Sequence, residues 1–233
     1  MTNNAITALQ KTLGANNVLS TPGAMAPYLQ ERRGRFTGHR VAAVLTPGST
    51  TEVAAAVQQC RTLQLNVIPQ GGNTGLCGGA AALSHDPHSV IVSLERLNKI
   101  RVLDAENFTL TAEAGCRLSA LQDAAAAADR LFPLSYAAEH DCQIGGNLAT
   151  NAGGMNVLRY GNARELALGL EVVLADGQIW HGLTGLRKDN SGYDLRNLFI
   201  GSEGTLGIIT AATLKLFPAL RCQATAIIGL ADM

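Results

Sequence analysis

A glycine-rich stretch at residues 67–79, VIPQGGNTGLCGG, constrains this chain more than any other feature. It begins as a short apolar strand, Asn66–Ile68, which we expect Pro69 to end because proline lacks a backbone N–H donor. Five of the ten residues that follow Pro69 are glycine, so the main chain can approach a ligand closely. The loop contains no charged side chain, and a concave row of its amides would hold a phosphate or pyrophosphate. A simple turn is the alternative interpretation.

The composition argues against several classes of partner. Lys and Arg together number 18, as do Asp and Glu, and aromatic residues make up 4%. Without a basic stripe or aromatic stacking platforms we expect no nucleic-acid partner. No apolar run reaches the ~20 residues that cross a bilayer, and the N-terminus lacks a signal-peptide pattern. The five cysteines are scattered and odd in number, so we expect a reduced, cytoplasmic protein without a structural metal.

The first hundred residues alternate between apolar strands and a helix. Residues 15–40 are polar and turn-rich, and Val41–Leu45 then predicts a strand. Ser49–Glu52 forms a capping box that starts a helix, and strands follow at Asn66–Ile68 and Val90–Leu94. A helix between two strands is the usual crossover of a parallel pair, so the pattern predicts a small α/β unit.

A second glycine-rich stretch, CQIGGNLATNAGG at residues 142–154, repeats the pattern of the first. It too has paired glycines, Asn and Thr side chains and no charge. Two such stretches about 75 positions apart are hard to explain as independent turns. Together they predict two loops that clasp one elongated ligand, polar in its middle and planar at its ends, as a dinucleotide is. A third stretch, Gly201–Gly207, carries one carboxylate at its centre, Glu203.

The remaining segments predict one helix and several strands. Leu118–Leu131 contains five consecutive alanines and predicts a helix. Leu166–Leu174 is an apolar strand, and the Asp-Gly pair after it is a strong hairpin signal. Ile208–Phe217 predicts another strand, and Gln223–Leu230 begins a further alternating one. We interpret residues 221–233 as the start of a further domain, so that this chain belongs to a longer polypeptide.

Five motifs resemble the flavin-binding domain of the FAD-linked oxidases, the vanillyl-alcohol oxidase / para-cresol methylhydroxylase superfamily. Within it, the resemblance is to the group of glycolate oxidase subunits, D-lactate dehydrogenases and D-2-hydroxyglutarate dehydrogenases. The motifs are PQGGNTG at 69–75, IGGNLATNAGG at 144–154, RYG at 159–161, KDNSGYD at 188–194 and LFIGSEGTLGIIT at 198–210. The resemblance covers roughly residues 38–220.

The resemblance implies an α+β fold of the para-cresol methylhydroxylase type, with FAD between two subdomains. We expect an FAD-binding domain over residues 1–220, with subdomains at about 38–100 and 101–220. Residues 221–233 would begin a substrate or cap domain. Many relatives attach FAD covalently through His or Cys, but the first stretch has no His, so we expect non-covalent FAD.

The resemblance also implies which residues bind FAD. The first stretch would wrap the pyrophosphate, and the second would follow the pyrophosphate, the ribityl chain and the ring. Gly161 would lie near the adenine or ribityl end, and the third stretch would contact the adenosine part or the ring edge. The implied residues are Pro69, Gln70, Gly71, Gly72, Asn73, Thr74, Gly75, Leu76, Gly145, Gly146, Asn147, Thr150, Asn151, Gly153, Gly154, Gly161, Glu203, Gly204, Gly207 and Ile208.

The activity implied by the resemblance is oxidation of a D-2-hydroxy acid to a 2-oxo acid by hydride transfer to FAD. The substrate would be a small 2-hydroxy acid, the electron acceptor is unassigned, and a homo-oligomer is an open alternative. In this group a cap domain and a C-terminal segment hold the substrate. A second hypothesis is therefore an FAD-binding subunit or fragment without catalysis of its own. An NAD-binding Rossmann domain is weakly supported, because no strand–GxGxxG–helix unit precedes an acidic residue at the required distance.

The sequence assigns no catalytic base. The histidines are isolated from one another, at positions 39, 85, 88, 140 and 181. His85 and His88 have metal-ligand spacing, but no third ligand is nearby, so no metal site is expected. His140 is the histidine beside a glycine-rich stretch.

Overall fold

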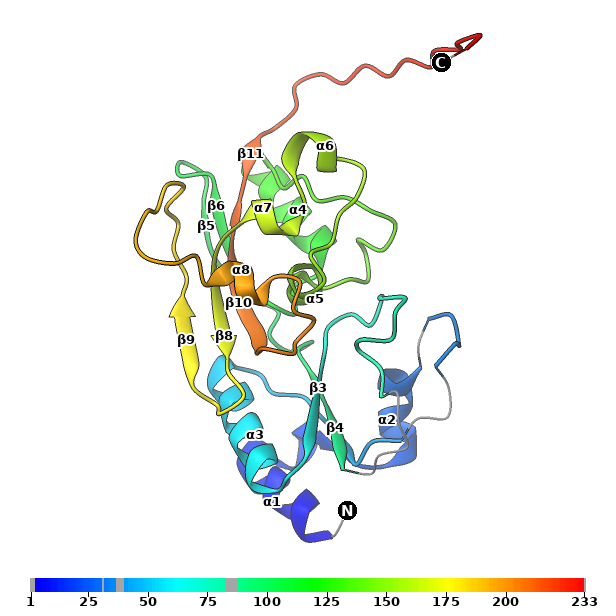
Figure 1. The fold of residues 1–233 in the computed structure, drawn as a ribbon, viewed down its shortest axis with the longest axis vertical. Coiled ribbons are helices and arrows are strands. Elements are labelled where there is room, and N and C mark those ends of the chain that lie inside the picture. Colours follow the sequence, from blue (N-terminus) through cyan, green and yellow to red (C-terminus); the bar gives the residue numbers. More distant parts are fainter. Residues whose placement is uncertain (1–2, 31, 37–39, 83–87, 233) are drawn as a thin grey trace.

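The computed structural model describes residues 3–30, 32–36, 40–82 and 88–232. Figure 1 shows two sheets with helices packed around them and a C-terminal segment that extends away from the body. The helices are α1 (Asn3–Leu13), the 3₁₀ turn η1 (Ala15–Asn17), α2 (Pro22–Leu29), α3 (Thr50–Thr62), α4 (Leu118–Ala127), α5 (Ile144–Ala149), α6 (Val157–Tyr160), α7 (Ala163–Leu166) and α8 (Arg196–Phe199). The strands are β1 (Val18–Leu19), β2 (Ala43–Leu45), β3 (Asn66–Gln70), β4 (Ser89–Ser93), β5 (Ile100–Asp104), β6 (Thr109–Glu113), β7 (Arg130–Leu131), β8 (Ala167–Val173), β9 (Ile179–Gly182), β10 (Ile208–Lys215) and β11 (Phe217–Pro218).

The first sheet has the order β1-β2-β4-β3, and β4 pairs in parallel with both β2 and β3. The expected parallel unit is confirmed, with α3 as its crossover. Ser49 caps α3 by accepting from the backbone N–H of Glu52 at 3.1 Å. The Glu52 carboxylate accepts in turn from the N–H of Gly48 at 2.7 Å. Two free donors at the start of the helix are thus satisfied, as a capping box requires.

The prediction that Pro69 ends its strand was wrong. The strand β3 continues through Pro69 to Gln70, and Pro69 pairs with Val92 of β4. Among the described strands, β3 lies at the edge of its sheet and pairs with β4 alone. Proline can occupy such a strand because its missing N–H faces away from the ladder.

The second sheet is antiparallel, with the order β5-β6-β10-β8-β9. The expected hairpin is confirmed: β8 and β9 are joined at Asp176-Gly177, where Gly177 has φ 82°. Leu121 of α4 and Leu148 of α5 are fully buried in one cluster with Leu170 and Leu214 of the sheet. The first glycine-rich stretch thus follows the edge strand of the first sheet, and the second contains α5, which packs on the second sheet.

Three further expectations were wrong. The helix at residues 118–131 ends at Ala127, because Arg130–Leu131 pairs as β7 with β11. The turn-rich segment 15–40 contains α2, which begins at Pro22, a residue favoured in the first turn. Gln223–Leu230 forms no strand and is exposed, since none of the described strands lies alongside to pair with it. Among the described residues, no helix is long and apolar enough to cross a membrane.

A buried polar network joins the two sheets through Glu171 of β8. The Glu171 carboxylate accepts from the hydroxyl of Thr50 at 2.6 Å and from that of Thr210 at 3.0 Å. Arg101 donates to the same carboxylate at 3.0 Å and pairs with Glu113 at 3.3 Å. Because Thr50 begins α3, this network fastens the helix of the first sheet to the second sheet.

The network lowers the pKa of the Glu171 carboxyl. Burial works to raise this pKa, but the hydrogen bonds from Arg101, Thr50 and Thr210 and the charge of Arg101 together lower it below the ordinary 4.5. His181 lies 3.8 Å away and adds attraction when it is protonated. A carboxyl with a lowered pKa stabilises the fold above the unfolded-state pKa, and this stabilisation is lost as pH falls through the folded-state pKa.

We expect Glu171→Gln to lower the free energy of unfolding by about 1.5–3 kcal/mol at pH 7, because it removes the charged acceptor shared by Arg101, Thr50 and Thr210. The wild type should also lose more stability than the variant when pH falls from 6 to 3. Urea unfolding across this range measures both effects. Glu106→Gln, at an exposed position, is the control and should change stability by less than about 0.5 kcal/mol. Equal acid sensitivity of wild type and Glu171→Gln would contradict the role of the network.

Candidate functional site

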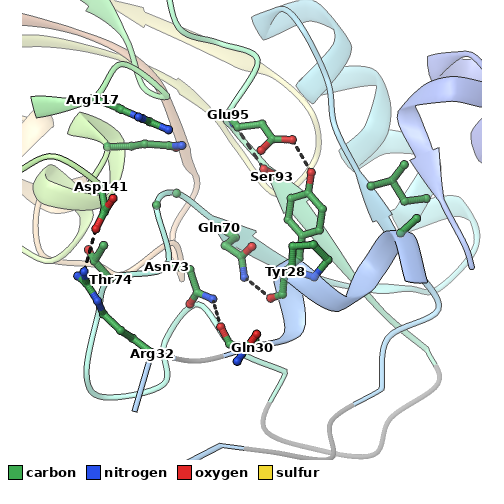
Figure 2. Close-up of a pocket in the computed structure, with 16 residues that line it drawn as sticks. Tyr28, Gln30, Arg32, Gln70, Asn73, Thr74, Ser93, Glu95, Arg117 and Asp141 are labelled. Carbon is green, nitrogen blue, oxygen red and sulfur yellow. Dashed lines mark hydrogen bonds and ion pairs between the residues drawn. The ribbon is translucent and has the colours of Figure 1, made fainter. Parts of the chain in front are cut away.

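A pocket of about 700 Å³ lies beside the first glycine-rich stretch. Its walls come from α2 and the residues after it, the ends of β3 and β4, and the start of the second stretch (Figure 2). Five of the expected cofactor residues line it: Gln70, Gly71, Gly72, Asn73 and Thr74. This volume falls in the range of small-molecule and cofactor sites.

The backbone amides of the first stretch are free. Within the described part of the chain, no N–H from Gly71 to Ala80 donates a hydrogen bond to another residue. The loop is held instead by side chains. Gln70 donates to the carbonyls of Tyr28 at 2.9 Å and Ala80 at 2.8 Å, and Asn73 donates to Gln30 at 3.1 Å. Folding fixes the loop while leaving its donors available to a ligand.

The first and second stretches touch. A Cβ at Gly72 would overlap the carbonyl oxygen of Asp141, and one at Gly71 would lie 3.6 Å from the Cα of Gly146. Direct contact between their backbones therefore sets the distance between the two stretches. This contact brings the two predicted loops together at one place.

The third stretch meets the first at two points. A Cβ at Gly204 would lie 2.9 Å from Pro69 Cγ, and one at Gly79 would lie 2.8 Å from the carboxylate of Glu203. Glu203 also donates its backbone N–H to Ala149, at the end of α5, at 2.9 Å. All three glycine-rich segments thus contact one another.

The second stretch is not a loop throughout, because residues 144–149 form α5. The predicted cofactor residues in this helix differ in their surroundings: some pack inside the chain, and one faces open space. Gly145 packs where a Cβ would lie 2.6 Å from that of Ala114, and buried Asn147 hydrogen-bonds with the hydroxyl of Tyr136. Gly146 has no atom within 4 Å of a built Cβ, so its missing side chain is not required by packing inside the chain.

The glycines after α5 are required by packing. A Cβ at Gly153 would lie 2.6 Å from the side chain of Asn162, and one at Gly154 would overlap the carbonyl of Ser135. Gly161 has φ 80°, and its Cβ would lie 2.5 Å from Glu165.

The other predicted residues occupy varied surroundings. Thr150 donates its hydroxyl to Gly146 at 2.9 Å. Gly207 packs against Val172, and Ile208 is buried in β10. At Gly75 nothing lies within 4 Å of a built Cβ, and Leu76 is exposed.

Arg164 of α7 positions the third stretch, although no motif in the sequence marked it. Its guanidinium donates to the carbonyls of Asn197 at 2.8 Å and Ile200 at 2.6 Å, at the end of α8. Its backbone N–H donates to the side chain of Asn151 at 3.0 Å. One residue therefore ties the second stretch to the third.

The pocket also contains polar residues outside the predicted cofactor set. Tyr28 donates to Glu95 at 2.5 Å, and burial, followed by this bond and the Glu95 charge, raises the pKa of its phenol, which stays protonated. Arg32 pairs with Asp141 at 2.8 Å, an exposed bridge between the segment after α2 and the second stretch.

Arg117 and Gln143 complete the added lining, and a single bridge joins their backbones. Gln143 is nine-tenths buried. Its Oε1 and the Oδ1 of Asn147 are the two buried side-chain atoms without a hydrogen-bond partner in the part of the chain described. In the sequence, Gln143 stands two residues before the first of the paired glycines, Gly145 and Gly146.

The histidines do not gather at the pocket. His88, His140 and His181 lie within the described residues, and none of them lines it. His39 and His85 lie outside the described residues. The described residues contain no group of three or more His, Cys, Asp or Glu side chains placed to hold a metal ion.

A family model described as FAD binding domain matches residues 41–182. D-2-hydroxyglutarate dehydrogenase of Xanthomonas citri pv. viticola is 44% identical over 216 residues, which are 93% of this chain and 45% of that protein. The mitochondrial D-2-hydroxyglutarate dehydrogenase of Bos taurus is 47% identical over 175 residues, 75% of this chain and 32% of that protein. The chain thus spans less than half the length of these relatives.

Two solved structures show the fold. Alkyldihydroxyacetonephosphate synthase matches with a TM-score of 0.84 at 21% identity, over 95% of this chain and 41% of that one. p-Cresol methylhydroxylase with substrate bound matches with a TM-score of 0.78 at 23% identity, over 94% of this chain and 44% of that one. The expected α+β fold of the para-cresol methylhydroxylase type is confirmed.

We expect Gly72→Ala to lower the free energy of unfolding by about 1–3 kcal/mol, because its Cβ would force the chain away from Asp141. Gly146→Ala is the matched control. Its Cβ would enter open space within a helix, so stability should stay the same or rise by about 0.5–1 kcal/mol. Urea unfolding of the ligand-free chain measures both. Equal stabilities of the two variants would argue against backbone contact between the stretches.

Proposed function

We propose that this chain, which belongs to the FAD-binding domain family, is the flavin-binding part of an oxidoreductase that oxidises a D-2-hydroxy acid, with D-2-hydroxyglutarate as the first candidate. The observation that carries the proposal is the row of free amides from Gly71 to Ala80, where the three glycine-rich segments meet. The names of the relatives support the choice of substrate.

The residues present fit FAD. The free amides of the first stretch would bind its pyrophosphate, because they supply donors without charged side chains. At Gly75 and Gly146 a built Cβ meets only open space, which would let the cofactor approach the main chain. FAD supplies the hydride acceptor when it is bound. The protein holds it, orients it and limits the access of water.

We also propose that FAD binds non-covalently. Cys142 is buried, and its sulfur accepts a hydrogen bond from Asn147 at 3.5 Å, which leaves it poorly placed for attachment. Cys77 and His140 are exposed. Release of free flavin by acid or heat, with no flavin left on the denatured chain, would support this mode. Flavin that stays with the denatured protein would contradict it.

A second candidate is an FAD-binding subunit or fragment without catalysis of its own. The relatives carry more than half of their length outside the matched region. None of the described histidines lines the pocket, so no general base of that type is placed there. Both candidates require FAD and differ in turnover. Cytoplasmic location, the electron acceptor, a homo-oligomer and a further domain at residues 221–233 stay proposals to test.

We expect the purified chain to bind FAD, with quenching of flavin fluorescence on titration. Gly146→Ala should weaken this binding about tenfold, because its Cβ would occupy space that the ligand-free fold leaves open. Its stability without FAD should not fall. Gly23→Ala, in α2 and also without neighbours within 4 Å, is the control and should bind FAD as the wild type does. A wild-type chain that neither quenches nor retains FAD would end the proposal.

We expect the 233-residue chain loaded with FAD to show no turnover of D-2-hydroxyglutarate, D-lactate or glycolate with a dye acceptor. The reason is that it spans less than half of the dehydrogenases it resembles. Bleaching of the flavin band under anaerobic conditions provides a second measurement. Turnover above that of free FAD would favour a complete catalyst and reject the second candidate.

A further inference from the structure

Gln143 has an unsatisfied oxygen at the wall of the pocket. Its side chain is nine-tenths buried and lines the pocket, and its Oε1 has no hydrogen-bond partner among the described residues. Buried polar atoms are nearly always paired in folded proteins. An unpaired one at a pocket wall therefore points to a partner supplied by a ligand.

The main chain around Gln143 holds this side chain in place. Its carbonyl accepts from the N–H of Asn147 at 3.0 Å, as the first bond of α5. Its backbone also pairs with Arg117 in an isolated bridge, and the next residue, Ile144, donates to Cys116 at 2.9 Å. A ligand would meet a carboxamide whose backbone is already ordered, which limits the entropy lost on binding.

The position of Gln143 defines the chemistry of its partner. Its Oε1 lies 3.6 Å from a Cβ built at Gly71, directly beside the row of free amides. That row consists of donors and binds acceptors, such as phosphate oxygens. Oε1 is an acceptor and needs an O–H or N–H group. An ionised pyrophosphate has neither, whereas the sugar groups attached to it carry hydroxyls.

We propose that Gln143 is a positioning residue for FAD whose Oε1 accepts a hydrogen bond from a sugar hydroxyl next to the pyrophosphate, on the ribityl chain or the ribose. This inference rests on the proposed function. It assigns the amides of the first stretch to the phosphates and Gln143 to the adjoining alcohol. Together, the amides and Gln143 would fix the position of the cofactor along the pocket.

If Gln143 had a purely structural role, its substitution would lower stability and leave FAD affinity unchanged. The proposal predicts the reverse. Because Gln143 Oε1 is unpaired, Gln143→Met keeps the length of the side chain and removes a buried unsatisfied atom. Stability without FAD should therefore stay the same or rise, while FAD affinity falls. Gln122 provides the matched control. It donates to the carbonyl of Leu134 at 2.8 Å, so Gln122→Met should lose stability and keep its FAD affinity.

The test is a fluorescence titration of FAD into each 233-residue variant, with the unfolding midpoint measured without FAD. We expect Gln143→Met to bind FAD about tenfold more weakly than the wild type. Unchanged affinity of Gln143→Met would overturn the proposal.

Two further ligands separate the sources of the hydroxyl. Calorimetry with FMN, which carries the ribityl chain, and with ADP, which carries the ribose, compares the wild type with Gln143→Met. A loss confined to FMN assigns the ribityl chain, and a loss confined to ADP assigns the ribose. A loss with neither would contradict a hydroxyl partner. Failure of the wild type to bind FAD would instead refute the proposed function, which keeps the two failures distinct.

Discussion

The close contact between Gly72 and the carbonyl of Asp141 is the constraint on which the pocket depends. No side chain fits at Gly72, so the edge strand β3 delivers its loop directly against the start of the second stretch. Asp141 in turn pairs with Arg32, and Gln70 joins the two ends of the loop to α2. Once this approach is made, the start of the loop, residues 71–74, borders a pocket that the chain itself does not fill.

Local signals in the sequence predicted much of the fold. Ser49 with Glu52, and Asp176 with Gly177, each fix a helix start or a hairpin by chemistry within a few residues. The predictions failed where the structure depends on contacts between residues distant in the sequence. Pro69 stays in a strand because β3, among the described strands, has a neighbour on one side alone. Gly145 stays in a helix because close packing on Ala114 leaves no room for a Cβ, which outweighs the low helix propensity of glycine.

The candidate site was predictable in its backbone and not in its side chains. Glycine clusters leave a pattern, so the segments that meet at the pocket were found from the sequence. Gln143 and Arg164 are single polar residues whose partners are distant in sequence or absent from the chain, and single residues carry no periodicity. Tyr28 lies in a helix whose position over the loop depends on long-range contacts such as its bond to Glu95.

The contrast between two polar regions argues for where the ligand belongs. Around Glu171 the hydroxyls and the Arg101 guanidinium satisfy the carboxylate, as expected of groups that stabilise a fold. The amides from Gly71 to Ala80 and the oxygen of Gln143 find no partner among the described residues. The chain thus satisfies its buried polar groups at one junction and leaves the buried oxygen of Gln143 unpaired at the next. Such local inconsistency is typical of a functional site, and a ligand with acceptors in its middle and hydroxyl donors beside them would complete both sets of groups.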